Sequence, residues 1–330
     1  MKRVMAAILM VVLVMMTSFG VKAAESSDIT EQTQKTIVLV HGGWHGEWSW
    51  YKVKDILTDQ GFNVVTIELP AHGNDSTCSW EISLKDYEQK IISNLDSLGL
   101  NNVTLVGHGT SGVLISRVAE LRPDMVEKIV FVGGVVASDN ESISSVLLKD
   151  YKSVALKNAR VNVLSGEIYI KENAVNQAIY NTVTDEDDLA ICDEKVQGEP
   201  LLPLLCKIGL GSNYYSVPKY YIRTMQDNCV TPNYQSQLLG KTYFSAVYEM
   251  DTCHMPFISN PNNFVNIIQE ITNKEEAYRI MTASDPVDEN NIDEVMEIHN
   301  QIVENAAQEE MSLEEYMVLF EEYQSEMETN

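Results

Sequence analysis

The segment 103–116, VTLVGHGTSGVLIS, places an apolar run of strand length, a glycine-rich turn and a helix-forming run in direct succession. This is the layout in which a G-x-S-x-G motif presents a nucleophilic serine on a sharp strand-to-helix turn. Here Gly109 stands at the position of the serine, and the nearest serine, Ser111, follows two residues later. The segment therefore predicts a nucleophile elbow from which the nucleophile is missing.

Outside this segment, further apolar runs have the length of buried strands, and helical segments alternate with them. We predict strands at 36–40, 63–67, 103–106, 128–132, 219–223 and 244–248, and helices at 50–59, 83–98, 112–121 and 262–272. Fully apolar strands that alternate with helices indicate a parallel sheet covered on both faces. The fold class is therefore α/β, with a mostly parallel sheet flanked by helices.

A long insertion interrupts this alternation between the strands at 128–132 and 219–223. Residues 138–216 lack a regular strand pattern and indicate short helices, including 185–191 and 201–208, joined by loops. An insertion at the carboxyl edge of a parallel sheet typically covers the functional site. We therefore predict a helical cap at about 138–216, within a main domain spanning 36–273.

The segment 274–330 differs in composition, because it carries 17 acidic and two basic residues. Ser312 and Glu315 have the spacing of a capping box. Apolar or ring-bearing side chains recur at helical spacing in two groups, Ile292, Val295, Met296, His299 and Val303, then Leu313, Tyr316, Leu319, Phe320 and Tyr323. These patterns predict an acidic helical extension whose helices pack on the domain or on each other, or bind a partner protein.

The N-terminus has the features of a secretory signal peptide over 1–23. Lys2 and Arg3 precede a 13-residue apolar run, and a small-x-small cleavage site ends at Ala23. The run is short for a membrane span of about 20 residues, although an uncleaved anchor stays an alternative. We therefore expect a secreted or extracytoplasmic protein, with a disordered polar leader over 24–35.

Charge and cysteine content bound the partners and the redox state. A net charge of −25 disfavours nucleic acid and anionic membranes as partners. The five cysteines are Cys78, Cys192, Cys206, Cys229 and Cys253, and their spacing does not indicate a zinc site. An exported chain permits disulfides, for which 192–206 and 229–253 are the expected pairs, although sequence alone does not decide the connectivity.

Reactive or glycine-rich residues follow several of the predicted strands. Glycines 42 and 43 follow the first strand, where backbone N–H groups can form an oxyanion hole. Asp227 and His254 follow the last two strands, in the order nucleophile, acid, histidine. Each signal is weak alone, but their places at successive strand ends indicate one shared site.

Five motifs together resemble the α/β-hydrolase superfamily. They are VLVHGGWHGEWSWYKV (38–53), IELPAHGNDS (67–76), LVGHGTSG (105–112), YYIRTMQD (220–227) and CHMPFISNP (253–261). They are most similar to the branch of methylesterases, hydroxynitrile lyases and pyrethroid-hydrolase-like proteins. The resemblance covers about 36–273 and implies an α/β-hydrolase fold that needs no cofactor or metal.

The resemblance also implies roles for individual residues. His254 corresponds to the general base and Asp227 to the carboxylate that orients it, with Asp139 as the fallback acid. The backbone N–H groups of Gly43 and Thr110 correspond to the oxyanion hole. Lyases of this branch carry a lysine directly after the histidine and a threonine in the first motif; Met255 and Gly42 occupy these positions here, which disfavours cyanohydrin cleavage.

Gly109 is the main departure from the family, because no acyl-enzyme can form on glycine. A register shift would make Ser111 the nucleophile, but it would place that serine inside the first turn of the helix. Cys78 and Cys253 are other thiols near the motifs. A water activated by His254 needs no covalent step.

Three functions follow as hypotheses. The first is an exported esterase-like hydrolase of a small apolar ester or carbonyl compound, working through an unusual nucleophile or an activated water. The second is a non-catalytic protein that binds a small molecule in the retained pocket. The third is cofactor-free base chemistry by His254 and Asp227 alone.

Overall fold

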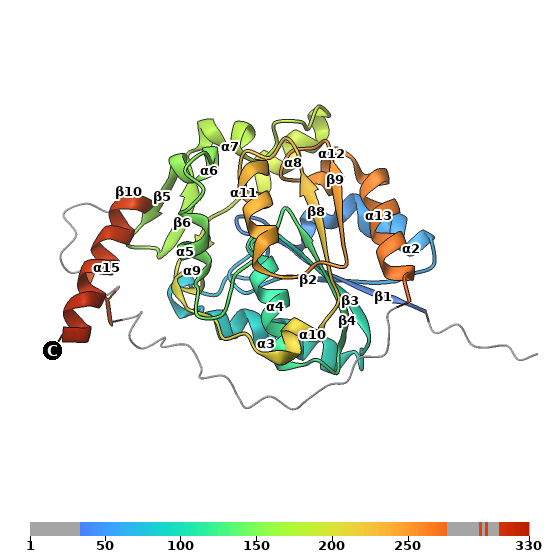
Figure 1. Ribbon diagram of the computed structural model, residues 1–330. Helices are drawn as coiled ribbons and strands as arrows, with labels where there is room; N and C mark the ends of the chain where they lie inside the picture. Colours follow the sequence, from blue (N-terminus) through green and yellow to red (C-terminus); the bar gives the residue numbers. More distant parts are fainter. Residues whose placement is uncertain (1–33, 276–296, 299–300, 303–309, 330) are drawn as a thin grey trace, which may run out of the picture. The chain divides into compact units, whose positions relative to one another are not determined.

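The computed structural model describes residues 34–275, 297–298, 301–302 and 310–329, and its elements lie in the compact unit Lys35–Asn330. Six parallel strands form the central sheet in the order β2-β1-β3-β4-β8-β9 (Figure 1). Their bounds are β1 Thr36–Val40, β2 Asn63–Ile67, β3 Val103–His108, β4 Val126–Val132, β8 Lys219–Thr224 and β9 Ala246–Met250. β3, which leads into the elbow, is an interior strand and is buried throughout, as its apolar sequence predicts.

Helices cover both faces of this sheet. One layer holds α2, α12 and α13, and the other holds α3, α4 and α10 (Figure 1). The helical segments of the main domain are η1 Glu47–Trp50, α2 Tyr51–Asp59, η2 Ser79–Glu81, α3 Leu84–Ser97, α4 Ser111–Leu121, α11 Pro232–Leu238, η3 Leu239–Lys241, α12 Pro256–Ser259 and α13 Pro261–Asn273. The α/β prediction is confirmed, and the predicted bounds agree within a few residues.

Among the strands of the central sheet, the last one, predicted at 244–248, is displaced at both ends. β9 begins two residues later, because Phe244 packs its ring on Phe131 and Tyr221 before the strand starts. The pairing with β8 then begins at Ala246, opposite Tyr220.

The cap contains a small antiparallel sheet that the sequence did not predict. Its elements are α5 Ile143–Leu147, α6 Val154–Asn158, β5 Ala159–Asn162, β6 Glu167–Ile170, α7 Glu172–Ala178, α8 Glu186–Lys195, β7 Glu199–Pro200, α9 Leu202–Leu205 and α10 Ser212–Ser216. The expectation of helices and loops alone is therefore wrong. Strands of two to four residues are too short for a period-two pattern to distinguish them from loops.

The C-terminal segment adds a strand and a helix to the cap. β10 Glu310–Ser312 pairs antiparallel with β5, and α15 spans Leu313–Thr329. At the start of α15, Ser312 Oγ accepts a hydrogen bond from Glu315 N–H at 3.1 Å, while the Glu315 carboxylate accepts one from Ser312 N–H at 2.8 Å. Of the apolar side chains named for this helix, Leu313, Tyr316 and Phe320 are buried, and Leu319 and Tyr323 are partly buried.

Several sequence predictions fall on residues outside those described. They are the signal peptide at 1–23, nearly all of the leader at 24–35, and most of the first C-terminal helix, of which 297–298 and 301–302 are described as helical. Within the described part of the chain, no helix has the length and apolar character needed to cross a membrane.

The two expected disulfides are not formed, and all five cysteines are free thiols. The Cys206 thiol donates a hydrogen bond to the Leu202 carbonyl at 3.4 Å. Cys192 lies near Tyr180, and Cys229 lies near His254. A disulfide requires two Cβ atoms that face each other about 3.8 Å apart, a geometry that sequence spacing does not report.

Candidate functional site

The elbow has the backbone of a nucleophile turn although its central residue is glycine. Gly109 lies between β3 and α4 with φ of +53°, in the left-handed region that disfavours side chains. Its N–H donates to the Val132 carbonyl at 3.1 Å, and its carbonyl accepts from Val135 N–H at 2.8 Å. Hydrogen bonds to the neighbouring strand and its loop therefore hold the turn in this conformation.

His254 faces this elbow. A Cβ added to Gly109 would lie 3.2 Å from His254 Nε2, so the imidazole nitrogen points at the place of a missing side chain. On its other side, His254 Nδ1 lies 2.7 Å from Asp227 Oδ2. Both side chains are buried. The predicted base and its carboxylate thus form one hydrogen-bonded pair, and the free nitrogen is directed at Gly109.

Several donors hold the Asp227 carboxylate in place. Oδ1 accepts the N–H groups of Cys229 at 2.7 Å and Val230 at 2.9 Å. Oδ2 accepts the Thr224 hydroxyl at 2.7 Å, in addition to the imidazole. Because charge-assisted hydrogen bonds reach both oxygens, the carboxylate is oriented before any substrate binds.

Gly133 makes room for this pair, and the sequence analysis did not single it out. It follows β4 with φ of +49°, and a Cβ there would lie 3.2 Å from Asp227 Oδ2 and 3.4 Å from His254 Nδ1. The glycine pair after an apolar strand was the available sequence signal. Any side chain at this position would press on the His254–Asp227 hydrogen bond.

The electrostatic surroundings favour a protonated His254. Burial disfavours the imidazolium, but Asp227 and the Cys229 thiol outweigh it and hold the pKa of His254 well above 6.5. Burial raises the pKa of the Cys229 thiol. Cys229 therefore lies beside the base, a neighbour that the sequence did not predict.

The two predicted oxyanion-hole residues lie together at the elbow. Gly43 N–H donates to Thr110 Oγ1 at 2.9 Å, so the hydroxyl takes the place that a substrate oxygen would occupy. Among the described residues, none accepts a hydrogen bond from Thr110 N–H. One N–H group is thus ready to bind an oxyanion, and the other becomes free if Thr110 rotates.

A buried carboxylate from the cap adjoins this hole and was missed from sequence. Glu199, in β7, accepts Trp44 N–H at 3.2 Å and lies 2.8 Å from His72 Nε2, while the Tyr87 hydroxyl donates to it at 3.3 Å. A Cβ on Gly43 would lie 3.1 Å from Glu199 Oε2. Burial lowers the pKa of His72, but Glu199 outweighs burial and the net shift is upward. This favours an ion pair beside the hole.

A small enclosed space, here called the elbow cavity, adjoins the oxyanion-hole residues. Its volume is about 20 Å³, enough for one water molecule. Its lining is mostly apolar and comes from the first loop, the elbow, the cap and the C-terminal segment: Gly43, Trp44, Thr110, Ser144, Leu147, Leu156, Ile168, Glu199, Leu201, Leu204 and Leu313. The cavity is therefore mostly apolar, with one carboxylate, that of Glu199, in its lining.

The structure does not bring the fallback residues to this site. The Ser111 hydroxyl is fully buried and donates to the His41 carbonyl, so it points away from His254. Asp139 accepts a hydrogen bond from Leu210 N–H at 2.9 Å on the cap side. Cys253 is buried, and its N–H donates to the Thr182 hydroxyl, whereas Cys78 is exposed. The shifted-serine and Asp139 alternatives therefore lack the geometry they require.

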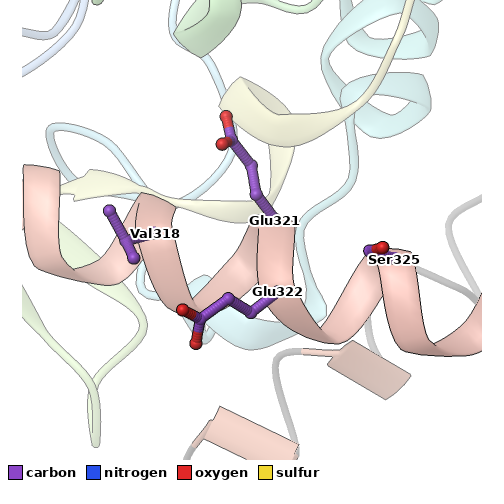
Figure 2. Close-up of a pocket in the computed structure, with 4 residues that line it drawn as sticks. All are labelled: Val318, Glu321, Glu322 and Ser325. Carbon is purple, nitrogen blue, oxygen red and sulfur yellow. The ribbon is translucent and has the colours of Figure 1, made fainter.

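Other hollows among the described residues are not lined by the predicted site residues. One lies on α15 and is lined by Val318, Glu321, Glu322 and Ser325; Figure 2 shows the two carboxylates pointing to opposite sides of the helix. Within the described ranges, no three histidine, cysteine or acidic side chains gather as metal ligands would.

Comparison with known proteins identifies the family of this fold. The model of the alpha/beta hydrolase family matches residues 37–267. Methylesterase 7 of Arabidopsis thaliana is 31% identical over 257 residues, covering 74% of this chain and 98% of the relative. Putative methylesterase 11 of the same plant is 29% identical, and the match covers 71% of this chain but only 63% of the relative.

Solved structures share the fold. Polyneuridine aldehyde esterase superposes with a TM-score of 0.66 at 23% identity, covering 73% of this chain and all of that one. Methylketone synthase I of tomato, complexed with 2-tridecanone, gives 0.62 at 22% identity over 73% and 98%. An extracellular alpha/beta-hydrolase from Paenibacillus gives 0.63 at 22% over 73% and 100%. With its elbow, its strand order and these matches, the chain belongs to the α/β-hydrolase family, on the methylesterase-like branch.

Proposed function

We propose that this protein hydrolyses small, neutral, largely apolar esters without a covalent intermediate. The observation that carries the proposal is the His254–Asp227 pair, whose free Nε2 points at the space beside Gly109. A serine hydroxyl at that place would be the nucleophile in the family's usual route. A water molecule there can donate its proton to His254 instead.

The reaction then runs through general base catalysis. Neutral His254 accepts a proton from water while the water oxygen adds to the ester carbonyl. The carbonyl oxygen becomes an oxyanion bound by Thr110 N–H and, after the threonine hydroxyl rotates away, by Gly43 N–H. The tetrahedral intermediate collapses, and the imidazolium returns its proton to the departing alkoxide.

The lining indicates the substrate class. Leucine and isoleucine side chains dominate the elbow cavity and favour an apolar acyl group. Among the described residues, the lining contains the Glu199 carboxylate and no cationic side chain, which disfavours a negatively charged group on the substrate. Relatives named methylesterases suggest a small alkoxide as the leaving group.

A second candidate is proton transfer to or from a carbonyl compound, without ester cleavage. It is favoured by the absence of a side chain at Gly109, toward which His254 Nε2 points, and by the methyl ketone held in the tomato methylketone synthase structure. A charged keto acid would meet Glu199, however, so the neutral ester fits better.

The test is hydrolysis of p-nitrophenyl acetate by the full chain and by His254→Ala purified in the same way. We expect slow turnover without an initial burst of p-nitrophenol, a normal solvent isotope effect, and loss of turnover in the variant. Cys78→Ser, at an exposed position, is the control and should behave as the native chain. Turnover that persists in His254→Ala would refute His254 as the general base, and ligand binding would remain as the hypothesis. An initial burst would indicate a covalent intermediate.

We also propose that the protein is exported and processed near Ala23. The charged start, the apolar run and the cleavage site support it, as does the extracellular relative from Paenibacillus. N-terminal sequencing of the protein recovered from the extracytoplasmic fraction tests this. An intact Met1 on membrane-bound protein would indicate an uncleaved anchor.

A further inference from the structure

The elbow cavity is too small for the proposed substrate. At about 20 Å³ it holds one water molecule, while even methyl acetate has five heavy atoms that each need a comparable volume. The cavity lies beside Gly43 and Thr110, and its lining does not include Gly109 or His254. An ester bound at Gly43 and Thr110 therefore needs part of this lining to move.

Leu313 differs in origin from the rest of the lining. Gly43 and Trp44 belong to the first loop, Thr110 belongs to the elbow, and the other residues belong to the cap. Leu313, by contrast, begins α15 in the C-terminal segment. Its side chain is only 5% exposed. A residue more than 200 positions from the elbow thus closes the space beside the oxyanion hole.

The attachment of this segment is short. β10 has three residues and is the edge strand of the small cap sheet, in the order β10-β5-β6-β7. Met311 lies opposite Val161 of β5, and Ser312 lies opposite Arg160. Beyond this strand, the segment buries apolar side chains along one face: Met311, Leu313, Tyr316, Met317 and Phe320. A segment held by one three-residue edge strand and a single row of buried side chains opens at a lower free energy than the strands of the core.

We propose that residues 310–329 form a displaceable lid over the site. When β10 separates from β5, Leu313 leaves the elbow cavity and substrate can take its place beside Gly43 and Thr110. When the strand pairs again, Leu313 shuts out both substrate and bulk water. The lid concerns access to the cavity, and its test does not depend on turnover.

The experiment measures access to the cavity by chemical labelling of the full chain. Ser144 lines the cavity and is 4% exposed, so Ser144→Cys places a thiol there, in a Cys78→Ser background that removes the exposed native thiol. The rate of alkylation by iodoacetamide then reports how often the cavity opens.

Two variants loosen the lid in different ways. Leu313→Gly removes the side chain that fills the cavity, and Met311→Asp puts a charge at a buried position of β10. Each should speed alkylation at position 144 by about tenfold or more, since each removes buried apolar contacts. Val318→Ala, on an exposed position of α15, is the matched control and should leave the rate unchanged.

Labelling and turnover separate the two proposals. Unchanged alkylation in both Leu313→Gly and Met311→Asp would overturn the lid, whatever the esterase activity. Faster alkylation in a chain that hydrolyses no p-nitrophenyl acetate would support the lid and refute the hydrolase. If both proposals hold, Leu313→Gly also lowers the KM for the ester.

Discussion

Replacing Gly109 with serine would put a hydroxyl at the elbow. From the structure we can infer both the loss of stability and the gain in ester turnover. The backbone already has the left-handed φ of +53°, so the turn need not change. A side chain in that region costs about 1–2 kcal/mol. The new Cβ would lie 3.2 Å from His254 Nε2, and the imidazole must shift by a few tenths of an ångström.

These terms set the expected magnitudes for Gly109→Ser. The strain should lower Tm by about 2–4 °C for each kcal/mol in a domain of this size. In a well-studied serine hydrolase, removing the nucleophile lowers kcat by about 10⁶-fold. Misplacing a group by 1 Å can cost about 10²-fold. We therefore expect ester turnover to rise by about 10²- to 10⁴-fold, accompanied by a burst.

The assay pairs p-nitrophenyl acetate turnover with fluorophosphonate labelling. Gly109→Ala is the matched control, because it imposes the same strain and adds no hydroxyl. It should lose the same stability as Gly109→Ser without any gain in labelling or turnover. The double variant Gly109→Ser, His254→Ala should lose the labelling, since the hydroxyl then has no base.

Two outcomes would refute this reasoning. A folded Gly109→Ser that resists the fluorophosphonate would mean that His254 does not face the elbow in solution. Labelling of the native chain at Ser111 would mean that the helix starts in another register, in conflict with the buried hydrogen bond from Ser111 to the His41 carbonyl.

The remaining predictions concern the groups around the elbow. Activity should rise with pH as His254 deprotonates above 6.5, and Asp227→Asn should move this limb to lower pH and reduce kcat by about 10⁴-fold, because the carboxylate raises the imidazole pKa; a limb that stays in place would contradict the assignment. Thr110→Val should free Gly43 N–H for substrate and lower KM, at about 1–3 kcal/mol of stability for the unpaired donor; a loss of activity would instead make the hydroxyl a catalytic donor. Glu199→Gln should lower the free energy of unfolding by about 3–5 kcal/mol where its imidazole partner is protonated. Because folding raises the pKa of His72, this loss of unfolding free energy should be complete below pH 6.5 and should diminish as the pH rises through the raised pKa of His72. Denaturant titrations at several pH values would show it.

Much of the main domain was predictable because its signals are local. The runs at 36–40 and 63–67 are strands with the predicted bounds: the first is buried throughout, and the second is a half-buried edge strand rich in β-branched residues. Parallel strands end at one edge of the sheet, so Asp227 and His254 were expected together, and the structure places them 2.7 Å apart. The glycine at the nucleophile position was identified from its motif alone.

The tertiary structure decided what reaches the elbow from distant parts of the chain. Glu199 comes from a two-residue strand of the cap, Cys229 lies near His254, and Leu313 lines the cavity from the C-terminal segment. Gly133 matters only because two side chains meet above it. None of these neighbours is implied by spacing, because cap strands of two to four residues lack a readable period and contacts across more than 100 residues depend on packing. The sequence by itself determined the family's sheet and the glycine at the elbow, while the folded chain determined that the Glu199 carboxylate and the C-terminal segment line a cavity beside Gly43 and Thr110.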